Sequence, residues 1–502
     1  METIENKVQV NKEPTNGLTH IAKNWIDGAW MDTEKHSICY NPATGEQIGK
    51  YADGSVEEAQ KAVAAALRAF RKTPWKNDHA LRTKVLLAMA DGIEARRDEL
   101  TQIVCAESGK IMAEAAIEGF VAPAYLRYWA GKTFVAGRAG APKAGSISIT
   151  LREAAGVAGI IAPFNAPVGL ALRSLGPALA AGCTTVIKLP GITAQANEVF
   201  SKVISEVPDL PPGVINLITE SGNDVAKFLV QSPDVPVISF TGSTKTGRAI
   251  VAEGAAQLKR FNMELGGKTP MIVFKDADVE TAAFTIEKAI TFFSGQFCMT
   301  GSRILVQKEI AERVRQGLAE RLTNVKVGPA SDSSSEMGAM IDKANVQRVN
   351  GIVEEAIAAG AKVIVRGGPI TEGDLSKGAF YRPTLLEITD PDLPIVQQEV
   401  FGPVATLQVF DTEAEAIALA NNSEYGLAAS IWSRDIDTPW RVAKALQAGT
   451  IWINAYAQMF AEFEEGGYKQ SGIGRLNGEA ALDAFLEYKH ISFHPGLLSE
   501  DE

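Results

Sequence analysis

The amino-acid sequence predicts an α/β protein built from two doubly wound lobes. Strand-like apolar runs alternate with single helical segments between residues 156 and 264, and a second alternating series extends from about 270 to 455. Strands separated by single helices favour parallel sheets with right-handed crossovers. The chain has 502 residues, roughly three times the length of an ordinary domain of ~150 residues. Two lobes that face each other across a cleft are therefore expected, and such clefts commonly hold small molecules.

The segment before the alternating region, residues 55–130, is predicted to be mainly helical. Ser55 followed by Glu58 forms a capping box, and apolar residues recur on one face of the helix that follows. A run with β character, residues 146–153, interrupts the helical pattern before the first alternating series begins.

Both alternating series divide into individual elements. In the first, strands are expected at 156–162, 183–188, 214–219, 235–240 and 258–264, and helices at 168–181, 194–206, 222–231 and 244–256. In the second, strands are expected near 270–274, 302–307, 361–367, 405–410, 428–433 and 449–454. This order of elements places one sheet in each lobe.

Composition and charge narrow the class of partner. The formal net charge is −11, from 49 basic and 60 acidic residues, and no block of like charges marks a nucleic-acid or membrane surface. Prolines and an arginine interrupt the most apolar segment, 154–187, before the ~18 apolar residues of a membrane span accumulate. The four cysteines follow no metal-ligand or disulfide spacing, which indicates a reducing, cytoplasmic compartment. Small-molecule chemistry is favoured, with neither nucleic acid nor membrane as a partner.

Three loops carry residues suited to chemistry at a ligand. The turn Gly242-Ser243 joins a strand to a helix and can present backbone N–H groups to a phosphate, although it matches neither the dinucleotide nor the P-loop fingerprint. Asn165 stands close to prolines on both sides, either as a turn residue or as a rigid amide that stabilises an oxyanion. Glu264 ends a strand before a Gly-Gly pair, either as a surface acid or as a sheltered general base. Each pattern alone leaves both interpretations open.

Cys298 lies in the stretch FFSGQFCMTGSR, and it is either a buried apolar side chain or a nucleophile. A cysteine hydrolase of the papain kind would need a histidine beside the thiol. The histidines lie near the ends of the chain, at positions 20, 36, 79, 490 and 494, which disfavours that hypothesis. The stretch HISFH at 490–494 offers no third ligand, so no metal site is expected.

Seven short stretches follow one another along the chain: APFNAP, VIK, FTGSTKTG, MELGGK, GQFC, EVFGPV and GGYKQSGIGR. With them the chain resembles the aldehyde dehydrogenase superfamily over nearly its whole length. The resemblance implies that Cys298 attacks the aldehyde to form a thiohemiacetal, whose oxyanion Asn165 and the Cys298 backbone N–H stabilise. Hydride would then pass to a nicotinamide, and water activated by Glu264 would hydrolyse the resulting thioester.

The same resemblance implies NAD or NADP as the cofactor. The matching contact residues are Lys188 for the adenine ribose, Gly242 and Ser243 for the pyrophosphate, and Glu399 and Phe401 for the nicotinamide ribose and ring. Gly191 stands where many NAD-using relatives have a glutamate, whose carboxylate would repel a 2′-phosphate. NADP is therefore no longer excluded.

The substrate is predicted from the charge and aromatic residues near the site. Arg173 lies on the apolar helix after Asn165, and a buried charge needs a partner: either the carboxylate of a semialdehyde or a protein acid, Glu464 or Glu465. That Glu-Glu pair replaces the Pro-Phe of many relatives at the substrate mouth. A polar or carboxylate-bearing semialdehyde is the favoured substrate. The alternative is an aromatic aldehyde in a flat pocket walled by Phe292, Phe293, Phe297, Phe460 and Phe463.

The loop before the nucleophile is expected to shape the site. Ser294 and Gly295 would bend the chain so that the thiol faces the nicotinamide, while Phe293 and Phe297 would exclude bulk water. The sequence shows no cationic neighbour that would lower the pKa of the thiol.

The resemblance also divides the chain into functional parts. Residues 1–131 and 152–265 would bind the dinucleotide, and residues 266–466 would carry the nucleophile. Residues 132–151 and 480–495 would form a small β element that pairs strands across subunits, giving a homodimer or homotetramer.

Two rival functions share this fold. CoA-acylating relatives typically lack the general base, so Glu264 favours hydrolysis. Non-enzymatic relatives of the lens-crystallin kind keep the fold for solubility or structure. This chain retains Cys298, Glu264 and Asn165, which favours an enzyme. A hydrolytic, NAD(P)-dependent aldehyde dehydrogenase is therefore expected.

Overall fold

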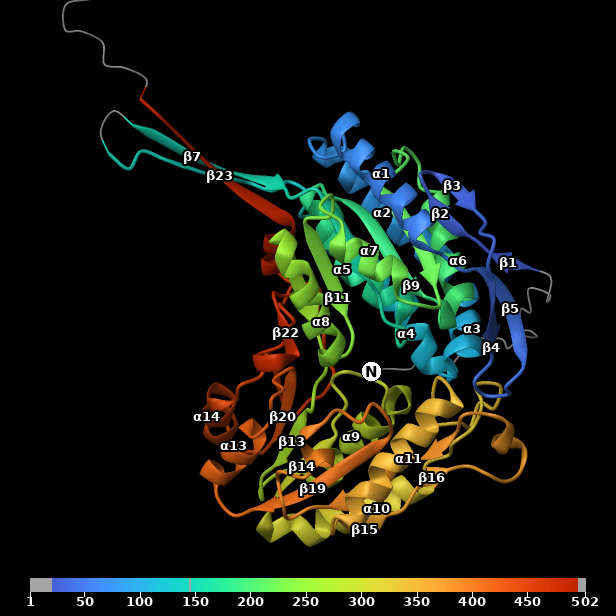
Figure 1. Ribbon diagram of the computed structural model, residues 1–502. Helices are drawn as coiled ribbons and strands as arrows, with labels where there is room; N and C mark the ends of the chain where they lie inside the picture. The colour runs from blue at the N-terminus through green and yellow to red at the C-terminus, as the bar shows by residue number, and fades with distance from the viewer. Residues whose placement is uncertain (1–19, 144–145, 495–502) are drawn as a thin grey trace, which may run out of the picture.

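The structure is a computed structural model, and it describes residues 20–143 and 146–494. Figure 1 shows two lobes, the upper around an eight-stranded sheet and the lower around a seven-stranded sheet. Two long strands, β7 (Ile147–Ala154) and β23 (Leu486–Phe493), leave the upper lobe side by side. The predicted pair of α/β lobes is confirmed.

Four helices form most of the N-terminal region: α1 (Val56–Lys72), α2 (His79–Ala95), α3 (Arg97–Ser108) and α4 (Met112–Ala130). The predicted capping box of Ser55 and Glu58 begins α1. The helical prediction for 55–130 is correct in kind, but the span is broken into separate helices. One break follows Gly109, whose φ of 76° is left-handed and ends α3.

Five parallel strands form the centre of the upper sheet, with helices between them. The strands are β8 (Val157–Ile161), β9 (Thr184–Pro190), β10 (Ile215–Glu220), β11 (Val237–Thr241) and β12 (Arg260–Glu264), and the helices are α5 (Pro167–Ala181), α6 (Ala194–Ser205), α7 (Asp224–Gln231) and α8 (Thr244–Gly254). Their spatial order is β10-β9-β8-β11-β12, the doubly wound order that reverses between β8 and β11. Helices cover both faces, so these strands are near-continuous buried apolar runs, and this made them predictable.

Short antiparallel strands extend this sheet at both edges, and the sequence did not predict them. One edge carries β2 (Asn24–Ile26) and β3 (Ala29–Met31), and the other carries β22 (Gly472–Ile473). A separate small sheet contains β1 (Ile21–Ala22), β4 (His36–Tyr40) and β5 (Gln47–Ala52). The pairing of β22 with β12 sets Gly472 opposite Glu264, which brings a distant C-terminal loop to the end of β12.

The lower sheet has the order β15-β18-β19-β14-β13-β20-β21. Its strands are β13 (Pro270–Val273), β14 (Arg303–Gln307), β15 (Lys362–Val365), β18 (Thr384–Glu387), β19 (Val404–Phe410), β20 (Ala428–Trp432) and β21 (Thr450–Ile453). The helices of this part of the chain are α9 (Val279–Thr291), α10 (Ala311–Asn324), α11 (Lys343–Ala358), α12 (Pro394–Gln397), α13 (Glu413–Asn421) and α14 (Asp437–Ala445). A two-stranded sheet, β16 (Gly368–Pro369) and β17 (Tyr381–Arg382), accompanies them. All pairs are parallel except β15 with β18, and β18 itself was not predicted.

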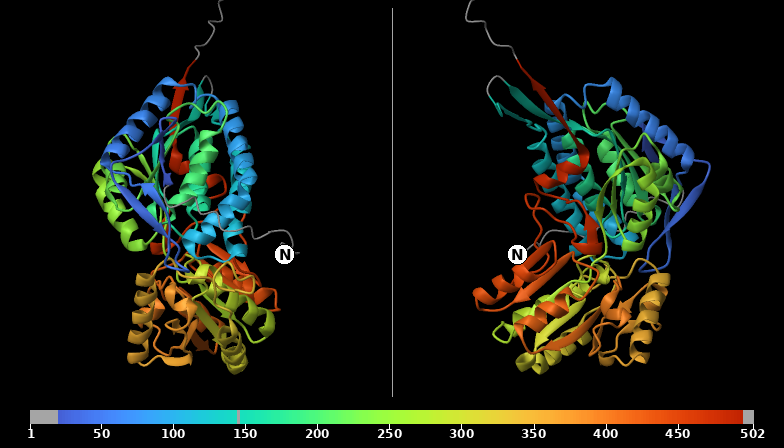
Figure 2. Two further views of the ribbon diagram at one scale, coloured as in Figure 1. Left: turned by 90° about the vertical axis from the view of Figure 1, so that its right-hand side faces the viewer. Right: turned by 60° about the vertical axis from the view of Figure 1, so that its left-hand side comes forward.

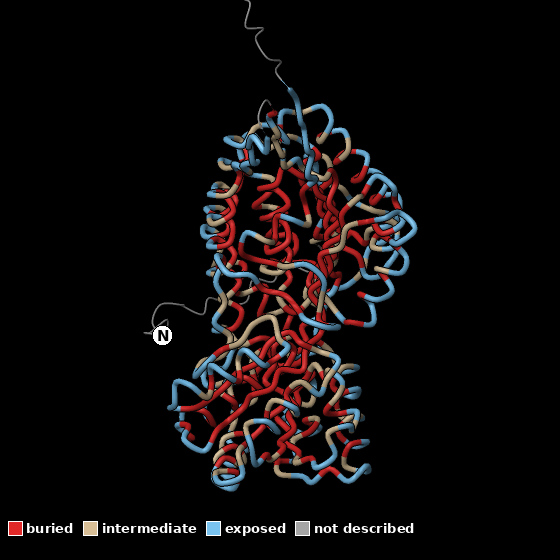
Figure 3. Tube along the Cα trace, turned by 90° about the vertical axis from the view of Figure 1, so that its left-hand side faces the viewer, coloured by how far each residue is buried: buried red, intermediate tan, exposed pale blue. Residues whose placement is uncertain are grey.

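A three-stranded arm projects from the upper lobe. It consists of β6 (Arg138–Gly140), β7 and β23, with β7 in the middle and both pairs antiparallel. Figure 2 shows the arm reaching beyond the lobes, and Figure 3 shows exposed residues along its length. Apolar side chains on it are exposed, among them Ile491 and Phe493. The predicted strand at 146–153 is confirmed to within about a residue at each end.

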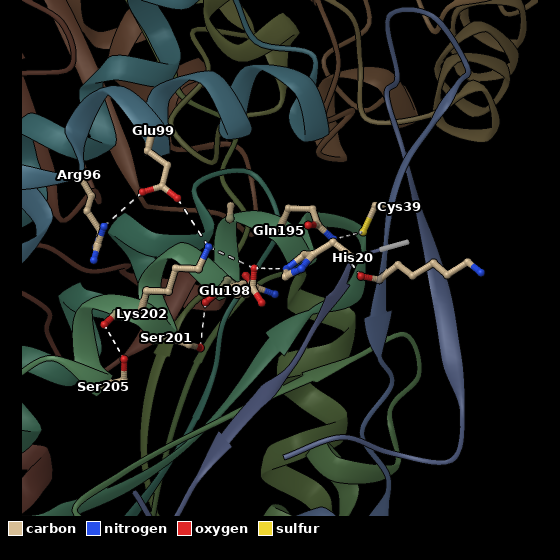
Figure 4. A network of polar contacts seen from close by, with 12 residues as sticks. His20, Cys39, Arg96, Glu99, Gln195, Glu198, Ser201, Lys202 and Ser205 are labelled. Carbon is tan, nitrogen blue, oxygen red and sulfur yellow. Dashed lines mark hydrogen bonds and ion pairs between the residues drawn. The ribbon is translucent and has the colours of Figure 1, made fainter. Parts of the chain in front are cut away.

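Ion pairs tie helix α6 to His20, directly before β1, and to α3 (Figure 4). The carboxylate of Glu198 lies 2.7 Å from His20 Nε2 and 3.4 Å from Lys202 Nζ. Lys202 Nζ is in turn 3.7 Å from Glu99 Oε1, and Arg96 lies 3.5 Å from the same acid. Partly exposed pairs of this kind each contribute little to stability.

Within the described residues, no helix is both long and apolar enough to cross a membrane. The same part of the chain contains no group of three or more His, Cys, Asp or Glu residues arranged to hold a metal ion.

Candidate active site

The predicted site residues of the upper lobe lie along the side of its sheet where the parallel strands end. They are Asn165 after β8, Lys188 in β9, Gly242 and Ser243 after β11, and Glu264 at the end of β12. These positions are at or near the carboxyl ends of the parallel strands, around the point where the strand order reverses. Ligands in open α/β sheets bind in that place.

Cys298 follows a sharply bent loop between α9 and β14. Phe293 and Ser294 have φ values of 53° and 54°, and Gly295 has 70°. The bend predicted at Ser294 and Gly295 is present, and it begins one residue earlier. A Cβ on Gly295 would lie 2.1 Å from the carbonyl carbon of Gly402, so the bend allows two loops of the lower lobe to touch.

The Cys298 thiol is half-buried and packs against a cluster of aromatic and methionine side chains. Burial raises the pKa of this thiol well above its usual value, and the negative charge of Glu264 raises it further. The positive charge of Arg173 acts in the opposite direction, because it favours the thiolate. The thiol therefore has a cationic neighbour that the sequence did not reveal, since Arg173 comes from a helix of the other lobe.

Glu264 is buried where its carboxylate interacts with the Cys298 thiol. Its Oε1 atom has no hydrogen-bond partner among the described residues. The Gly-Gly pair that follows allows close approach of other groups. A Cβ on Gly266 would lie 2.6 Å from Glu399 Oε2, and one on Gly267 would lie 2.4 Å from the Cys298 carbonyl oxygen.

Arg173 binds two protein carboxylates at once. Its Nη2 atom donates to Glu264 Oε2 at 2.7 Å, and its Nη1 atom donates to Glu465 Oε2 at 2.8 Å. Burial lowers the pKa of the guanidinium, but the charges of the two acids outweigh burial and raise it above its usual value. Of the two predicted protein partners, Glu465 is the one that pairs, whereas Glu464 Oε1 accepts the Ala480 N–H at 3.3 Å.

The cluster of Arg173, Glu264 and Glu465 is closed to solvent, with each residue no more than 3 % exposed. Burial raises the pKa of Glu465, while the charge of Arg173 lowers it in part. One guanidinium against two carboxylates leaves a formal charge of about −1 when both acids are ionised. Both Nη atoms of Arg173 are used by protein acids, and none is left for a substrate anion.

Asn165 is held against the loop that carries the thiol. Its Nδ2 atom donates to the carbonyl of Gln296 at 3.1 Å, and the side chain is buried. A primary amide has two N–H groups, so one remains for an additional acceptor. This hydrogen bond fixes the Asn165 amide beside Gln296, which is two residues before Cys298 in the sequence.

Glu118, on α4, holds the backbone that follows Asn165. Its Oε2 atom accepts the N–H groups of Val168 and Gly169, both at 3.0 Å, at the start of α5. Glu118 was not predicted from the sequence. It could have been noticed as a carboxylate on a mainly apolar helix, because acidic side chains are rarely buried without partners.

A second acid and a lysine from the same region hold the loop before Cys298. Glu114 Oε1 accepts the Phe293 N–H at 2.8 Å. Lys110 Nζ lies 3.1 Å from Glu118 Oε1 and 3.9 Å from the centroid of the Phe293 ring. Since Glu118 also holds the Asn165 turn, this buried cluster links the two loops of the site.

Glu399 and Phe401 lie in the loop between α12 and β19, close to the same edge. Glu399 Oε1 accepts the Gly267 N–H at 3.2 Å, and burial raises the pKa of this acid to about 7. The Phe401 ring meets the Phe164 ring edge to face, with 6.0 Å between centroids. The loop thus joins the turn of Asn165 to the Gly-Gly pair after Glu264.

The Gly242-Ser243 turn leads into an exposed helix start. Ser243 Oγ accepts the Thr246 N–H at 3.2 Å and caps α8. A Cβ on Gly242 would lie 2.4 Å from the Phe240 ring, and its N–H donates to the Glu264 carbonyl at 3.0 Å. The positive end of the α8 dipole therefore faces outward beside the carboxyl end of β12.

The five candidate phenylalanines do not form one wall. Phe292, Phe293 and Phe297 belong to the cluster around Cys298. Phe460 and Phe463 are 54 % and 68 % exposed, which places them outside that cluster. The aromatic pocket expected from all five is therefore only partly present.

Other side chains that the sequence analysis did not name complete the apolar cluster. They are Ile117, Met299, Leu427, Trp452, Tyr456 and Met459. The Tyr456 hydroxyl donates to the Met299 carbonyl at 2.9 Å, next to the nucleophile in sequence. Met299 is adjacent to Cys298 in sequence, whereas the others come from α4, from just before β20, and from β21 and the loop after it, so folding brings them to the thiol.

The fold and the site define a two-lobed α/β protein in which a cysteine of one lobe faces a buried carboxylate and an amide of the other. The sequence model of the aldehyde dehydrogenase family matches residues 30–491. The chain belongs to the aldehyde dehydrogenase family, and its activity is the oxidation of an aldehyde. The resemblance predicted from the short motifs is confirmed.

Individual relatives match over almost the whole chain. Betaine aldehyde dehydrogenase of Bacillus subtilis (strain 168) is 39% identical over 472 residues, which cover 93% of this chain and 96% of that protein. The structure of betaine aldehyde dehydrogenase from Staphylococcus aureus in complex with NAD+ has a TM-score of 0.93 at 36% identity, covering 96% of this chain and 97% of that one. A mutant of aldehyde dehydrogenase from Bacillus cereus has a TM-score of 0.93 at 34% identity, covering 97% and 99%.

Proposed function

We propose that this enzyme oxidises an aldehyde to the carboxylate through a covalent intermediate on Cys298. The observation that carries the proposal is the juxtaposition of the Cys298 thiol with the buried Glu264 carboxylate, next to the Asn165 amide that a 3.1 Å hydrogen bond ties to Gln296. A nucleophile, a base and an oxyanion donor in one site are the groups that acyl-transfer chemistry requires.

In the first step, Cys298 Sγ bonds to the carbonyl carbon and forms the thiohemiacetal. The free N–H of the Asn165 amide and the Cys298 backbone N–H stabilise the negative oxygen. Because burial and Glu264 hold the thiol protonated near neutral pH, the thiol must give up its proton as it attacks. The proton passes to solvent, and Glu264 is kept as the base for the second step, with Oε1 free of any other partner among the described residues.

In the second step, Glu264 serves the hydrolysis of the thioester. It takes one proton from a water molecule, the water oxygen bonds to the acyl carbon, and the carbon–sulfur bond breaks to release the carboxylate, while the second proton of the water passes to the Cys298 sulfur and restores the thiol. Arg173 supports this step because it holds Glu264 through Oε2 and leaves Oε1 for the water. A buried base at this position favours water over CoA as the acyl acceptor.

We propose NAD as the cofactor, as in the Staphylococcus aureus relative in complex with NAD+. The residues present fit a dinucleotide: the capped start of α8 at Ser243 suits a pyrophosphate, and a Cβ on Gly242 would crowd the turn. Lys188 would bind the adenine ribose, with Gly191 beside it, and Glu399 and Phe401 would bind the nicotinamide half. When bound, the nicotinamide supplies the acceptor for the hydride of the aldehyde.

For the substrate we propose a small polar aldehyde without a carboxylate at Arg173. The prediction of a carboxylate-bearing semialdehyde depended on a free guanidinium, whereas both Nη atoms of Arg173 bind protein acids. With no free cation at this place to hold an anionic group, neutral or cationic aldehydes are favoured over anionic ones. Betaine aldehyde, named for the relatives, belongs to the cationic class.

An aromatic aldehyde is the second candidate for the substrate. Phe297 and Tyr456 pack in the apolar cluster that meets the Cys298 thiol. Aromatic faces hold flat rings, and they also attract cations. The cluster therefore suits both kinds of aldehyde, and only measurement of turnover distinguishes them.

We also propose a division of labour along the chain. Residues 1–131 and 152–265 bind the dinucleotide, and residues 266–466 carry the nucleophile. The arm of β6, β7 and β23, which overlaps the predicted segments 132–151 and 480–495, pairs with a second copy in a homodimer or homotetramer, since its exposed apolar strands are otherwise an aggregation hazard. Residues 144–145 and 495 of these segments, and residues 1–19 of the dinucleotide-binding part, lie outside the described residues. The cytoplasmic location stays a prediction.

The test is a panel of cationic, neutral, aromatic and carboxylated aldehydes, each assayed with NAD and NADP. One carboxylate per reduced nucleotide is expected, with the carboxylated aldehydes poorest in kcat/KM. Cys298→Ala should lose turnover and still bind NADH, whereas Cys105→Ala, on α3, should keep both. Turnover in purified Cys298→Ala would rule out the covalent route.

A further inference from the structure

The space beside Gly191 is closed to a side chain. A Cβ on Gly191 would lie 2.3 Å from the hydroxyl oxygen of Tyr51 and 3.1 Å from the carbonyl oxygen of Glu220. Tyr51 is 3 % exposed, so the packed surroundings oppose its displacement. The glutamate that many NAD-using relatives have at this position would not fit here. Any discrimination against a 2′-phosphate must come from another residue.

Glu220 brings a carboxylate to the same place from the neighbouring strand. It is the last residue of β10 and pairs in register with Pro190, directly before Gly191. Its Oε1 atom accepts the Val225 N–H at 2.9 Å and so caps the start of α7. Its Oε2 atom is buried and has no hydrogen-bond partner among the described residues. The capping hydrogen bond uses Oε1, so Oε2 remains available as an acceptor for a ligand hydroxyl.

The charge of Glu220 acts on the lysine proposed to meet the adenine ribose. Lys188 pairs in register with Ile218, two residues before Glu220 on the same strand. Burial lowers the pKa of Lys188, and Glu220 is the strongest opposing influence, ahead of Asp53. Asp53 is already paired with Lys35 at 2.6 Å, so these two charges largely offset each other. Burial raises the pKa of Glu220, and the charge of Lys188 lowers it in part. Unlike Asp53, Glu220 makes no close ion pair among the described residues, so its carboxylate is the one that a ligand at Lys188 would meet.

We propose that Glu220 selects NAD over NADP in this enzyme, in place of the glutamate for which Gly191 leaves no room. The inference rests on the proposed function, because it concerns the cofactor of that reaction. A 2′-phosphate near Lys188 would add about two negative charges next to a buried carboxylate, where solvent screens repulsion weakly. A 2′-hydroxyl carries no charge and meets no such repulsion. The expectation from Gly191 alone, that NADP is no longer excluded, is reversed under this proposal.

The experiment measures binding of NADH and NADPH by nucleotide fluorescence, in Cys298→Ala so that no turnover intervenes. Without a change at Glu220, the Kd for NADPH should exceed that for NADH by about tenfold or more. Glu220→Gln should lower the Kd for NADPH by about tenfold and change that for NADH little. Glu220→Ala should shift the ratio in the same direction, and it serves if the glutamine variant does not fold.

Asp224→Asn is the matched control, because Asp224 is an exposed acid at the start of α7, the helix that Glu220 caps. It should leave the NADPH to NADH ratio within about twofold of the parent. An unchanged ratio in both Glu220 variants, or equal affinity of the parent for the two nucleotides, overturns the assignment and leaves the proposed function intact. Binding of neither nucleotide overturns the proposed cofactor together with this assignment.

Discussion

Arg173 Nη2 lies 2.7 Å from Glu264 Oε2, so the carboxylate next to the Cys298 thiol is held by a guanidinium from the helix after Asn165. This ion pair is buried, and a second acid, Glu465, shares the arginine. Buried pairs are strongly destabilised when one partner is removed, by about 3–5 kcal/mol. Arg173 is therefore a positioning residue for Glu264 in this account.

Replacement of Arg173 should impair all aldehydes alike. Arg173→Leu leaves two buried acids without their partner, so we expect kcat/KM to fall by about a hundredfold, ~3 kcal/mol, for carboxylated and neutral aldehydes of similar size. The thermal midpoint should fall as well, and the double variant Arg173→Leu with Glu465→Gln should recover part of it. Loss confined to the carboxylated aldehyde would mean that Arg173 binds substrate.

The reactivity of Cys298 should rise steadily with pH in the ligand-free enzyme. Its raised pKa keeps the thiol protonated near neutral pH, and the thiolate is the reactive form. The rate of alkylation by iodoacetamide should increase about tenfold per pH unit from about pH 7 to 9, without a plateau. Glu264→Gln removes the charge that raises this pKa, and should speed alkylation at about pH 8, whereas Glu464→Gln should not. A plateau near neutral pH in the unmodified enzyme would contradict the raised pKa.

Glu118 should influence catalysis without touching substrate. Glu118→Gln weakens its hydrogen bonds to Val168 and Gly169 and leaves Lys110 unpaired, so the two loops of the site lose their link. We expect kcat to fall by about tenfold while KM and the Kd for NADH stay nearly constant. The double variant with Lys110→Met removes the unpaired charge and should restore the thermal midpoint but not kcat. Recovery of kcat together with stability would show a purely structural role.

Much of the fold was predictable because the central strands are buried on both faces. Apolar runs such as 156–162 and 235–240 differ from β8 and β11 by no more than about two residues at each end. The short edge strands β2, β3 and β22 escaped prediction because two or three residues carry no periodic pattern. Their existence depends on pairing with strands that lie far away in sequence.

The candidate site was predictable in its members but not in its pairings. The motifs named Cys298, Glu264 and Asn165. The need of a buried charge for a partner suggested a substrate carboxylate, Glu464 or Glu465 for Arg173, and Glu465 is the predicted acid that pairs. The second partner, Glu264, followed only from the structure, because folding brings the end of β12 next to Arg173 on α5. The left-handed backbone conformation of Phe293 could not be predicted either, because bulky residues rarely adopt that conformation.

The central claim is that Glu264 activates the water that hydrolyses a thioester on Cys298. The most direct measurement is rapid-mixing kinetics of Glu264→Gln with a good aldehyde and NAD, followed by intact-protein mass spectrometry of the quenched enzyme. We expect a burst of NADH close to one per active site, slow turnover afterwards, and an added acyl mass that Cys298→Ala lacks. Loss of the burst together with turnover, with no acyl adduct, would contradict it, because Glu264 would then be required before the thioester forms.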